Sequence, residues 1–341
     1  MSGSSMHSPL RLGFTGDVML GRLVDRHQRN RLPEAVWGEM LDRLRSLDGL
    51  FLNLECCLST RGRRWTRTYR PFHFRADPAW AIPALRTAGV DWVALANNHV
   101  LDYGPEALVD TLEHLYRAGI AHAGAGRTLA EAREPSLVAV ADGALTVGLV
   151  SFTDNTPEYA ATPDSPGTAY VEIDHTDDRT RTIVRESLSA LRAAEPDLLV
   201  SSLHWGPNMV ESPPDAFRDF AHWLIDEGVD VVHGHSAHVF QGIEVYEGKP
   251  ICYDTGDFVD DYAVDPELRN DRSFLFELRI ERGGELRELR LFSTEIDEFA
   301  VQPASSGSAR WSRDRMRARS EPFGTSFDRD DGELRLPLSG F

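Results

Sequence analysis

The stretch ALANNHVLDYG, residues 94–104, decides the fold. It continues an apolar run from Val90 that predicts a buried strand, and this strand leads directly into Asn97, Asn98 and His99. Two amides and an imidazole at the mouth of a strand lose hydration energy unless they gain partners. These side chains are therefore expected to hold something at the end of the strand.

Chain length and composition set the broad class of protein. The 341 residues approach the upper limit for one hydrophobic core, and 41% hydrophobic with 26% charged residues is typical of a soluble globular enzyme. The formal net charge of -18 argues against a nucleic-acid partner and against a polyanion approaching at random. Three cysteines, Cys56, Cys57 and Cys252, give no disulfide framework and fit a reducing compartment.

No targeting segment is recognisable in the sequence. The N-terminus lacks the apolar core of a signal peptide, and no stretch approaches the roughly 18 uninterrupted apolar residues of a membrane span. We therefore expect a cytoplasmic protein that does not contact a membrane, with residues 1–10 disordered. The sequence makes no prediction of the oligomeric state.

Short apolar strands alternate with helical stretches along the first 240 residues. This alternation predicts an α/β fold, in which helices cover both faces of a parallel or mixed sheet. Hydrophobic periodicity predicts helices at 77–88, 105–118, 180–194 and 215–227. The predicted strands are 12–15, 50–54, 90–96, 145–152, 197–203 and 229–232.

The pattern changes after residue 240. Residues 243–253 predict a hairpin, and two short strands are expected near 274–280 and 287–292. The C-terminal segment is polar and rich in Arg, Asp, Ser and Gly, which predicts an irregular tail. The expected organisation is one main domain over residues 11–300 and a polar C-terminal tail over residues 301–341.

Five predicted strands end in an acid, an amide or a histidine. Because ligands of open α/β sheets gather at the carboxyl ends of strands, we expect these groups to converge on one site. Carboxylates, an amide and imidazoles form a ligand set suited to Mn²⁺, Zn²⁺ or Fe²⁺. The candidates are Asp17, Asn53, Glu55, Asn98, His99, His204, His233, His235 and His238.

Each candidate also has a purely structural interpretation. A lone histidine at a strand end is more often a satisfied structural group, and Asp17 could cap a helix that begins at Val18. Glu55 could be an exposed loop acid, and Asn98 could form an Asx turn. The repetition of one pattern on five strands nevertheless favours a shared site.

The motifs GDVMLGR, NLE, ALANNHVLDYG, HWG and GHSAH, in this order, resemble the CapA family, which is named for poly-γ-glutamate capsule biosynthesis. That family belongs to the calcineurin-like metallophosphoesterase superfamily. The resemblance covers about residues 11–260 and implies a four-layer α/β/β/α sandwich with mixed sheets. It also implies a divalent-metal site at the carboxyl edge of the sheets.

The resemblance implies a role for each residue of the site. Glu55 would bridge two metals, and Asp17 would anchor the second of them. His99 matches the superfamily's catalytic histidine, which contacts substrate rather than metal, and Asp17 and His204 would assist catalysis. The implied metal ligands are Asp17, Glu55, Asn98, His204, His235 and His238.

Two departures from the superfamily pattern change the expected metal content. The superfamily's Asp-x-His motif is here Asp17-Val-Met19, and its Gly-His-x-His motif is Gly234-His-Ser-Ala-His238. The second metal site therefore loses one ligand and has another displaced, which weakens the case for a two-metal clamp. We expect one ion, or two of unequal affinity.

Residues 61–75, RGRRWTRTYRPFHFR, hold six arginines and no acid in an otherwise acidic chain. One interpretation is a loop that contacts the acidic body of the protein. The other is a flap whose guanidinium groups bind carboxylate or phosphate. On the second interpretation Arg22, Arg70 and Arg75 bind substrate, while Asp257 adds an acid at the rim of the site. The expected substrate is then a small anionic molecule or a peptide.

Three classes of function fit these features. A metal-dependent hydrolase of a phosphoester or amide bond would use metal to activate water and His99 as an acid, and we favour this class. A peptide epimerase would use a histidine and an acid to move a proton at an α-carbon, as some CapA-like proteins do. A non-catalytic subunit of polymer synthesis is the third class, and the missing membrane anchor weighs against it.

Overall fold

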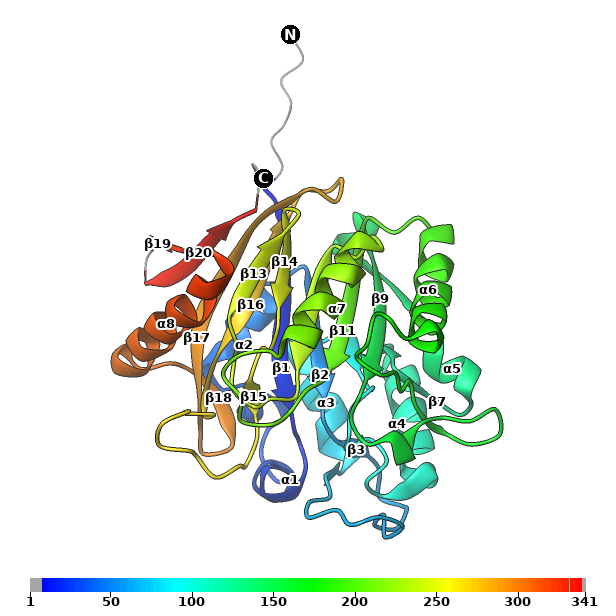
Figure 1. Cartoon of the computed structure of the whole chain (residues 1–341). Coiled ribbons are helices and arrows are strands. Elements are labelled where there is room, and N and C mark those ends of the chain that lie inside the picture. The colour runs from blue at the N-terminus through cyan, green and yellow to red at the C-terminus, as the bar shows by residue number, and fades with distance from the viewer. Residues whose placement is uncertain (1–7, 331, 339–341) are drawn as a thin grey trace.

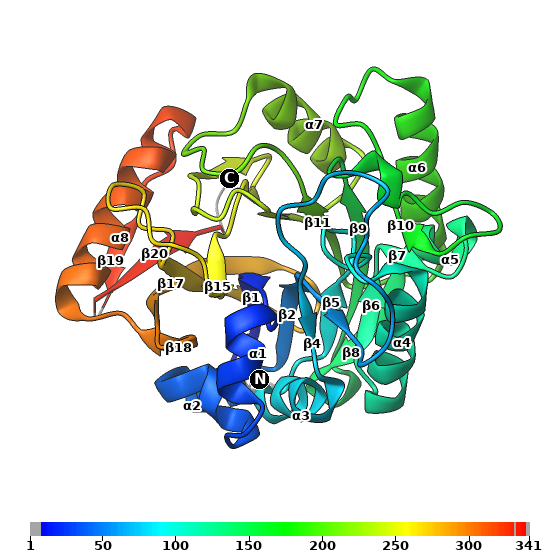
Figure 2. The same ribbon diagram turned by 90° about the horizontal axis from the view of Figure 1, so that it is seen from below.

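Two mixed β-sheets pack face to face in the computed structural model, which describes residues 8–330 and 332–338 (Figure 1). Apolar side chains of both sheets form one buried cluster between them, where Phe14 and Phe51 of the first sheet join Val147 and Val200 of the second. Helices lie against the two outer faces, as Figure 2 shows from below. The α/β fold with an α/β/β/α layer order is therefore confirmed.

The first sheet is built around β1 (Leu10–Val18), whose residues are nearly all buried because the strand is covered on both faces. On one side of β1 the pairing is parallel, and on the other it is antiparallel. The parallel side holds β2 (Gly49–Leu54), β5 (Trp92–Ala94) and β6 (Ala121–Ala123). The antiparallel side holds β16 (Arg272–Ile280), β17 (Leu286–Asp297), β20 (Glu333–Pro337) and β19 (Asp328–Asp330).

Two short strands attach to this sheet outside its main order. β15 (Asp257–Val259) pairs in parallel with the end of β1, and β18 (Ala300–Pro303) pairs antiparallel with β17. The pairs β3 (Cys57–Leu58) with β4 (Arg75–Ala76), and β7 (Ala125–Gly126) with β10 (Gly167–Thr168), form separate ribbons.

The second sheet has, in spatial order, the strands β13 (Ile243–Tyr246), β14 (Lys249–Cys252), β12 (Val231–His235), β11 (Leu198–His204), β9 (Leu145–Thr153) and β8 (Ser136–Val140). Three consecutive parallel pairs at its centre join β14, β12, β11 and β9. The strands β13 and β8 pair antiparallel at its two edges.

Each outer helix layer has its own apolar core. Against the first sheet, Trp37, Leu85 and Leu108 belong to a buried cluster made by the helices of the N-terminal part. These are α1 (Arg22–Gln28), η1 (Pro33–Met40), α2 (Leu41–Arg45), α3 (Pro78–Ala88) and α4 (Gly104–Ala118). Against the second sheet, α6 (Asp178–Ala193) and α7 (Asp215–Asp226) bury Val184 and Phe220. Within the described ranges no helix has the length and apolarity needed to cross a membrane.

The short helices α5 (Leu129–Arg133), η2 (Ala141–Gly143), η3 (Pro157–Tyr159) and η4 (Glu321–Phe323) lie in connections between the larger elements. All four predicted helices are present, with bounds close to those expected. The strand predicted at 90–96 is shorter, because the chain turns after Ala94.

The prediction of an irregular C-terminal tail is wrong for the part that the structure describes. The helix α8 (Ser306–Ser320) packs against β13, β16 and β17, and β20 extends the first sheet. The domain therefore continues through residue 300 without a break in the sheet. Composition hid this because α8 buries small serines such as Ser312, and β20 buries only alternate residues, Leu334 and Leu336. Of the N-terminal segment expected to be disordered, residues 1–7 lie outside the described residues, and β1 begins at Leu10.

Candidate metal centre

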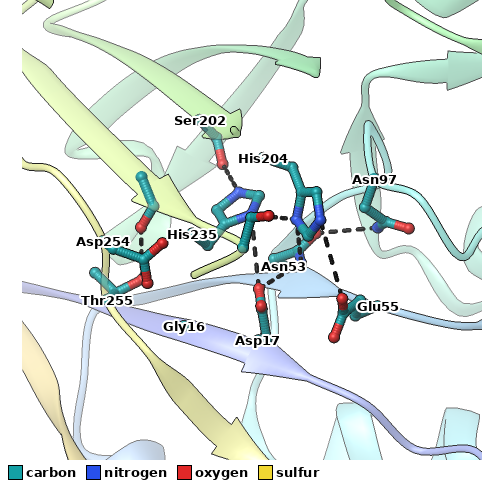
Figure 3. Close-up of polar contacts among 12 residues, drawn as sticks. Gly16, Asp17, Asn53, Glu55, Asn97, Ser202, His204, His235, Asp254 and Thr255 are labelled. Atoms are coloured by element: carbon teal, nitrogen blue, oxygen red, sulfur yellow. Dashed lines mark hydrogen bonds and ion pairs between the residues drawn. The ribbon is translucent and has the colours of Figure 1, made fainter. Parts of the chain in front are cut away.

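The polar strand ends of the two sheets meet in one buried cluster (Figure 3). Asp17 lies next to the end of β1 and is in register with Asn53 of β2. His204 and His235 end β11 and β12 and are in register with each other. Both sheets contribute because β1 contacts β12 across the sandwich. The carboxyl ends of parallel strands therefore form the site, as the strand-end pattern predicts.

Short distances connect the members of this cluster. His235 Nδ1 lies 3.0 Å from His204 Nδ1 and 3.6 Å from Asp17 Oδ1. His204 Nε2 lies 3.9 Å from Glu55 Oε1 and 3.1 Å from Asn98 Oδ1. These distances bring together five of the six implied metal ligands, namely Asp17, Glu55, Asn98, His204 and His235.

Among the residues that the structure describes, two groups of three side chains could each hold an ion, because within each group the three ligand atoms lie within 4.8 Å of one another. One group is Asp17, His204 and His235, and the other is Asp17, Glu55 and His238. Asp17 is common to both groups, whereas the family resemblance gives the bridging role to Glu55. The central position of β1, which pairs with β2 and contacts β12, puts Asp17 between the two sets of ligands.

The donor atoms fit a divalent cation. Asp17 Oδ2, Glu55 Oε1 and Asp257 Oδ2 are buried and have no hydrogen-bond partner among the described residues. Burial of a carboxylate oxygen without a partner costs free energy that a bound cation would offset. Carboxylate oxygens beside imidazole nitrogens form a set suited to Mn²⁺, Zn²⁺ or Fe²⁺.

The pKa shifts of the cluster residues in the absence of a metal also favour a cation site. Burial raises the pKa of Asp17 well above its usual value, with nearby Asp254 adding to the rise, and burial together with Asp17 raises that of Glu55. Burial lowers the pKa of His204 and His235 well below the usual value. Both effects disfavour charge in the metal-free site, so a bound cation would be needed to keep the carboxylates ionised.

The turn after β5 aims two neighbouring side chains at the cluster. Asn97 Oδ1 accepts hydrogen bonds from the backbone N–H groups of His99, at 3.1 Å, and Val100, at 3.0 Å. This is an Asx turn, and Asn97 forms it rather than Asn98. As a result Asn98 reaches His204 while the His99 ring also faces the site, which an extended strand end would not allow.

The ring of His99 is fixed on two sides. Its Nδ1 lies 2.6 Å from Asp102 Oδ2, and its face stacks on Phe74 with ring centroids 3.7 Å apart. Its other nitrogen, Nε2, lies 4.0 Å from Glu55 Oε1. Burial lowers the pKa of His99, and the charge of Asp102 opposes that effect. His99 thus presents one free nitrogen to the cluster.

The two departures from the superfamily motifs have different structural outcomes. The Met19 sulfur accepts a hydrogen bond from Gly21 N at 3.0 Å, and the side chain is buried in the apolar core, so it offers no ligand. His238 does reach the cluster, with Nδ1 3.5 Å from Asp17 Oδ2. The longer loop achieves this with left-handed backbone at Ser236 (φ 113°) and His238 (φ 62°), which costs roughly 1–3 kcal/mol per residue.

Asp257 does not lie at the rim of the site, where the sequence placed it. It is 1% exposed, in register with Asp17 on the neighbouring strand β15, and its Oδ1 lies 2.9 Å from His238 Nδ1. The pairing of β15 with β1 carries this carboxylate inward, and sequence spacing gives no hint of that pairing. Burial, reinforced by Asp260, raises the pKa of Asp257 well above its usual value.

The arginines assigned to substrate binding separate into different environments. Arg70 lies at the edge of the cluster, where it donates hydrogen bonds to the Asn98 carbonyl oxygen and to Thr156 Oγ1. Arg22 and Arg75 instead line a different cavity, described below. Arg61 pairs with Asp110 on α4, as expected of a loop that contacts the acidic body.

Sequence reasoning counted Asn53 among the strand-end candidates without giving it a role, and it missed a second positioning residue, Asp102. Asn53 donates a hydrogen bond to Asp17 Oδ1 at 2.7 Å and accepts one from Asn97 Nδ2 at 3.1 Å, so it orients the shared carboxylate. Asp102 orients His99. Its spacing of three residues from His99, within the turn that follows β5, is a signal that would have identified it.

A cavity of about 290 Å³ opens onto this cluster. His99 and His238 lie in its wall together with the aromatic residues Phe72, Phe74 and Tyr262. The Tyr262 hydroxyl donates a hydrogen bond to Glu55 Oε2 at 3.1 Å, which leaves Glu55 Oε1 for the cluster. The cavity gives a ligand access to the site beside His99.

Comparison with known proteins identifies the family of this chain. The family model described as "Bacterial capsule synthesis protein PGA_cap" matches residues 11–262, a span that contains every residue of the cluster. The chain belongs to the PGA_cap family. This confirms the resemblance to CapA proteins.

Several known proteins match along most of the chain. A probable polyglutamine synthesis accessory protein of Mycobacterium tuberculosis is 34% identical and covers 91% of this chain and 90% of its own length. The PGA biosynthesis protein CapA of Bacillus subtilis is 26% identical, covering 86% of this chain and 73% of its own length. TT1561 of Thermus thermophilus, a solved structure, matches with a TM-score of 0.45 and 11% identity over 82% of this chain and 97% of its own.

Proposed function

We propose that this PGA_cap protein is a divalent-metal-dependent hydrolase of a phosphoester or amide bond in an anionic substrate. The observation that carries the proposal is the buried cluster, in which the unpartnered oxygens Asp17 Oδ2 and Glu55 Oε1 lie beside a histidine held by a carboxylate. Relatives named for capsule and PGA synthesis support a substrate that carries carboxylates, and the relative named for polyglutamine synthesis supports one built on amide bonds.

The cluster residues would hold the ion or ions. Asp17, His204 and His235 would bind one ion, and Asp17 with Glu55 and His238 would bind a second, weaker one because Met19 supplies no ligand. A divalent ion bound there supplies Lewis acidity, which polarises the scissile group and lowers the pKa of water. Asn53 keeps Asp17 oriented through its hydrogen bond to Oδ1.

His99 would transfer the proton. Asp102 accepts the Nδ1–H hydrogen bond, so a neutral His99 carries its lone pair on Nε2, which faces Glu55 Oε1 and the cluster. It can take a proton from the attacking water and then return it to the leaving oxygen or nitrogen. The bond between the phosphoryl or acyl centre and that leaving atom breaks, and the water oxygen takes its place.

The charges of Arg70 and of the whole chain would determine which substrates bind and which are excluded. Arg70 would bind an anionic group near the reacting bond, because its guanidinium lies against the Asn98 carbonyl beside the cluster. We further propose a small anionic molecule or a peptide as substrate, and no nucleic-acid partner, since the net charge of -18 repels large polyanions. A cytoplasmic location stays a prediction.

One observation favours a second candidate, peptide epimerisation. His99 Nε2 and Glu55 Oε1, two groups able to exchange protons, lie 4.0 Å apart and face one space. If the α-carbon lay between the two groups, removal of the α-proton by one and delivery of a proton by the other to the opposite face of the carbanion would invert it. Incubation of peptides in D₂O would separate the two activities, because an epimerase incorporates deuterium and a hydrolase cleaves.

The test is purification without chelator, elemental analysis, and assay against phosphomonoesters, phosphodiesters and α- and γ-glutamyl amides. We expect bound Mn, Zn or Fe and turnover that chelation abolishes and metal restores. Turnover of the same substrate at an undiminished rate by metal-free protein would overturn the proposal.

A further inference from the structure

A second cavity beside the metal centre is lined by positive charge, although the chain is acidic. It encloses about 640 Å³ between α1 and residues 59–77. Five arginines line it, namely Arg22, Arg26, Arg29, Arg64 and Arg75. None of them is among the residues that could hold the metal.

Two acids in the wall of this cavity, Asp25 and Asp77, neutralise only part of the arginine charge. Asp25 accepts hydrogen bonds from Trp80 Nε1 at 2.7 Å and from Asp77 N at 2.9 Å, and it also pairs with Arg29. Asp77 caps α3 by accepting from Ala79 N. These carboxylates therefore hold α1 and α3 together, and the five arginines leave the wall with an excess of positive charge.

One guanidinium nitrogen has capacity for a ligand. Arg22 Nη1 is buried and has no hydrogen-bond partner among the described residues, while Nε of the same group lies 3.3 Å from Asp261 Oδ2. Arg22 has left-handed backbone, with φ 53°, at the junction between β1 and α1. An oxyanion in the cavity would give this nitrogen a charge-assisted partner.

A continuous row of rings connects the arginine-lined cavity to His99. The Arg22 guanidinium carbon lies 4.9 Å from the centroid of the Phe72 ring and 5.6 Å from that of Phe74. Phe74 stacks on His99, and Phe72 lines both this cavity and the one over the metal centre. Phe72 is half exposed and borders both cavities, so its ring lies where the two meet.

We propose that the arginine-lined cavity is a second binding site, for a carboxylate or phosphate group that the substrate carries away from its reacting bond. The substrate would cross Phe72, with its reacting bond at the cluster and its distant anion among Arg22, Arg26 and Arg64. That the bound molecule is a substrate rests on the proposed hydrolase function. Binding of an oxyanion in the cavity does not, because it can be measured without any assay of hydrolysis.

The experiment is isothermal titration of the metal-loaded protein with two probes, a tetraglutamate peptide and inorganic phosphate, at low ionic strength. Tetraglutamine serves as the neutral peptide. The double variant Arg26→Ala/Arg64→Ala removes two exposed cavity arginines, and Arg63→Ala/Arg67→Ala removes the same charge from the same face outside this cavity. We expect at least about tenfold weaker binding in the first variant and less than twofold change in the second.

A further titration separates this site from the metal centre. Asp17→Asn disables the cluster, and it should retain tetraglutamate or phosphate binding that Arg26→Ala/Arg64→Ala then abolishes. A preference for tetraglutamate identifies a carboxylate site, and a preference for phosphate a phosphate site. Equal binding of tetraglutamine, equal loss in both double variants, or binding that disappears with Asp17→Asn alone would overturn the second site. Failure of hydrolysis with retained binding would overturn only the hydrolase function.

Discussion

His99 Nδ1 and Asp102 Oδ2 lie 2.6 Å apart inside the turn that follows β5. Asp102 is itself fixed, because Phe74 N donates to Oδ2 at 2.7 Å and the Tyr159 hydroxyl donates to Oδ1 at 2.9 Å. This pair makes His99 a ring of fixed orientation with its second nitrogen at the cluster. The two residues are close in sequence, but the cluster that His99 faces includes His204 and His235, which end strands more than a hundred residues further along the chain.

Substitution of the imidazole should remove chemistry without removing metal. In His99→Ala we expect turnover to fall by ~10²–10⁴-fold, the usual contribution of a general acid–base group. Metal content should stay at the wild-type value because His99 belongs to neither candidate ligand group. Steady-state kinetics and elemental analysis on the same preparation check both parts. Wild-type turnover in this variant would make His99 a structural group.

Substitution of a proposed metal ligand should, in contrast to His99→Ala, lower the affinity for metal. Asp17→Asn and Asn98→Ala are expected to lower metal affinity at least ~10–100-fold, the loss typical even of residues that only orient a ligand. Asp17→Asn should have the larger effect, since Asp17 belongs to both ligand groups. Metal titration of chelator-treated protein measures the affinity. Arg61→Ala is the control, because Arg61 pairs with Asp110 rather than with a residue of the cluster, and this variant should bind metal normally.

The two altered motifs can be tested as a pair. Met19→Leu should leave metal stoichiometry unchanged and cost less than about 1.5 kcal/mol of stability, because the side chain is buried in the apolar core. His238→Ala should lower the occupancy of the weaker ion. Elemental analysis at graded metal concentrations distinguishes these results. Loss of an ion in Met19→Leu would show that the thioether is a ligand.

Arg70 is expected to act on the substrate rather than on the fold. Arg70→Ala removes a guanidinium that lies 13% exposed beside the cluster, so binding of an anionic substrate should weaken by ~1.5–3 kcal/mol. Arg75→Ala tests the arginine-lined cavity in the same assay and should weaken binding only of substrates with a second anion. Michaelis constants for singly and doubly charged substrates give the comparison. Unchanged constants in both variants would assign the whole segment to contacts with the acidic body.

Stability should fall in mild acid because of a histidine outside the metal centre. Burial lowers the pKa of His122 on β6 to about 4, and its Nδ1 has no hydrogen-bond partner among the described residues. The unfolded chain titrates near ~6.5 and binds the proton first, so stability is complete above that pH and declines as pH falls toward 4. The decline amounts to about 2–3 kcal/mol at 1.36 kcal/mol per unit.

Urea denaturation at pH 7.5, 5.5 and 4.5 measures this effect as the difference between wild type and His122→Gln. The variant cannot titrate, so it should lose less stability over the same interval. Equal losses in the two proteins would mean that the ring of His122 is protonated without cost in the folded state.

The α/β fold class and most ligand candidates were accessible from the residue pattern for a definite reason, whereas the four-layer order came from the family resemblance. Alternation of apolar strands and amphipathic helices is local, and in parallel sheets the carboxyl ends of the strands share an edge. Asp17, His204 and His235 could therefore be selected by position alone, before their distances were known. The small buried serines of α8 carry no such signal, and for that reason the C-terminal segment was misjudged.

The sequence by itself determined the family, the donor residues at the strand ends and the lack of an imidazole at position 19, where the chain has Met19. Each of these depends only on which residue stands at a given position. Only the tertiary structure decided that Asp17, rather than Glu55, is shared between two ligand groups. It also showed that Asp257 lies in the cluster and that Arg22 and Arg75 line a different cavity from the one beside Arg70 and the cluster. These relationships depend on how two sheets pack and how β15 joins β1, and contacts so distant in sequence leave no trace in spacing or composition.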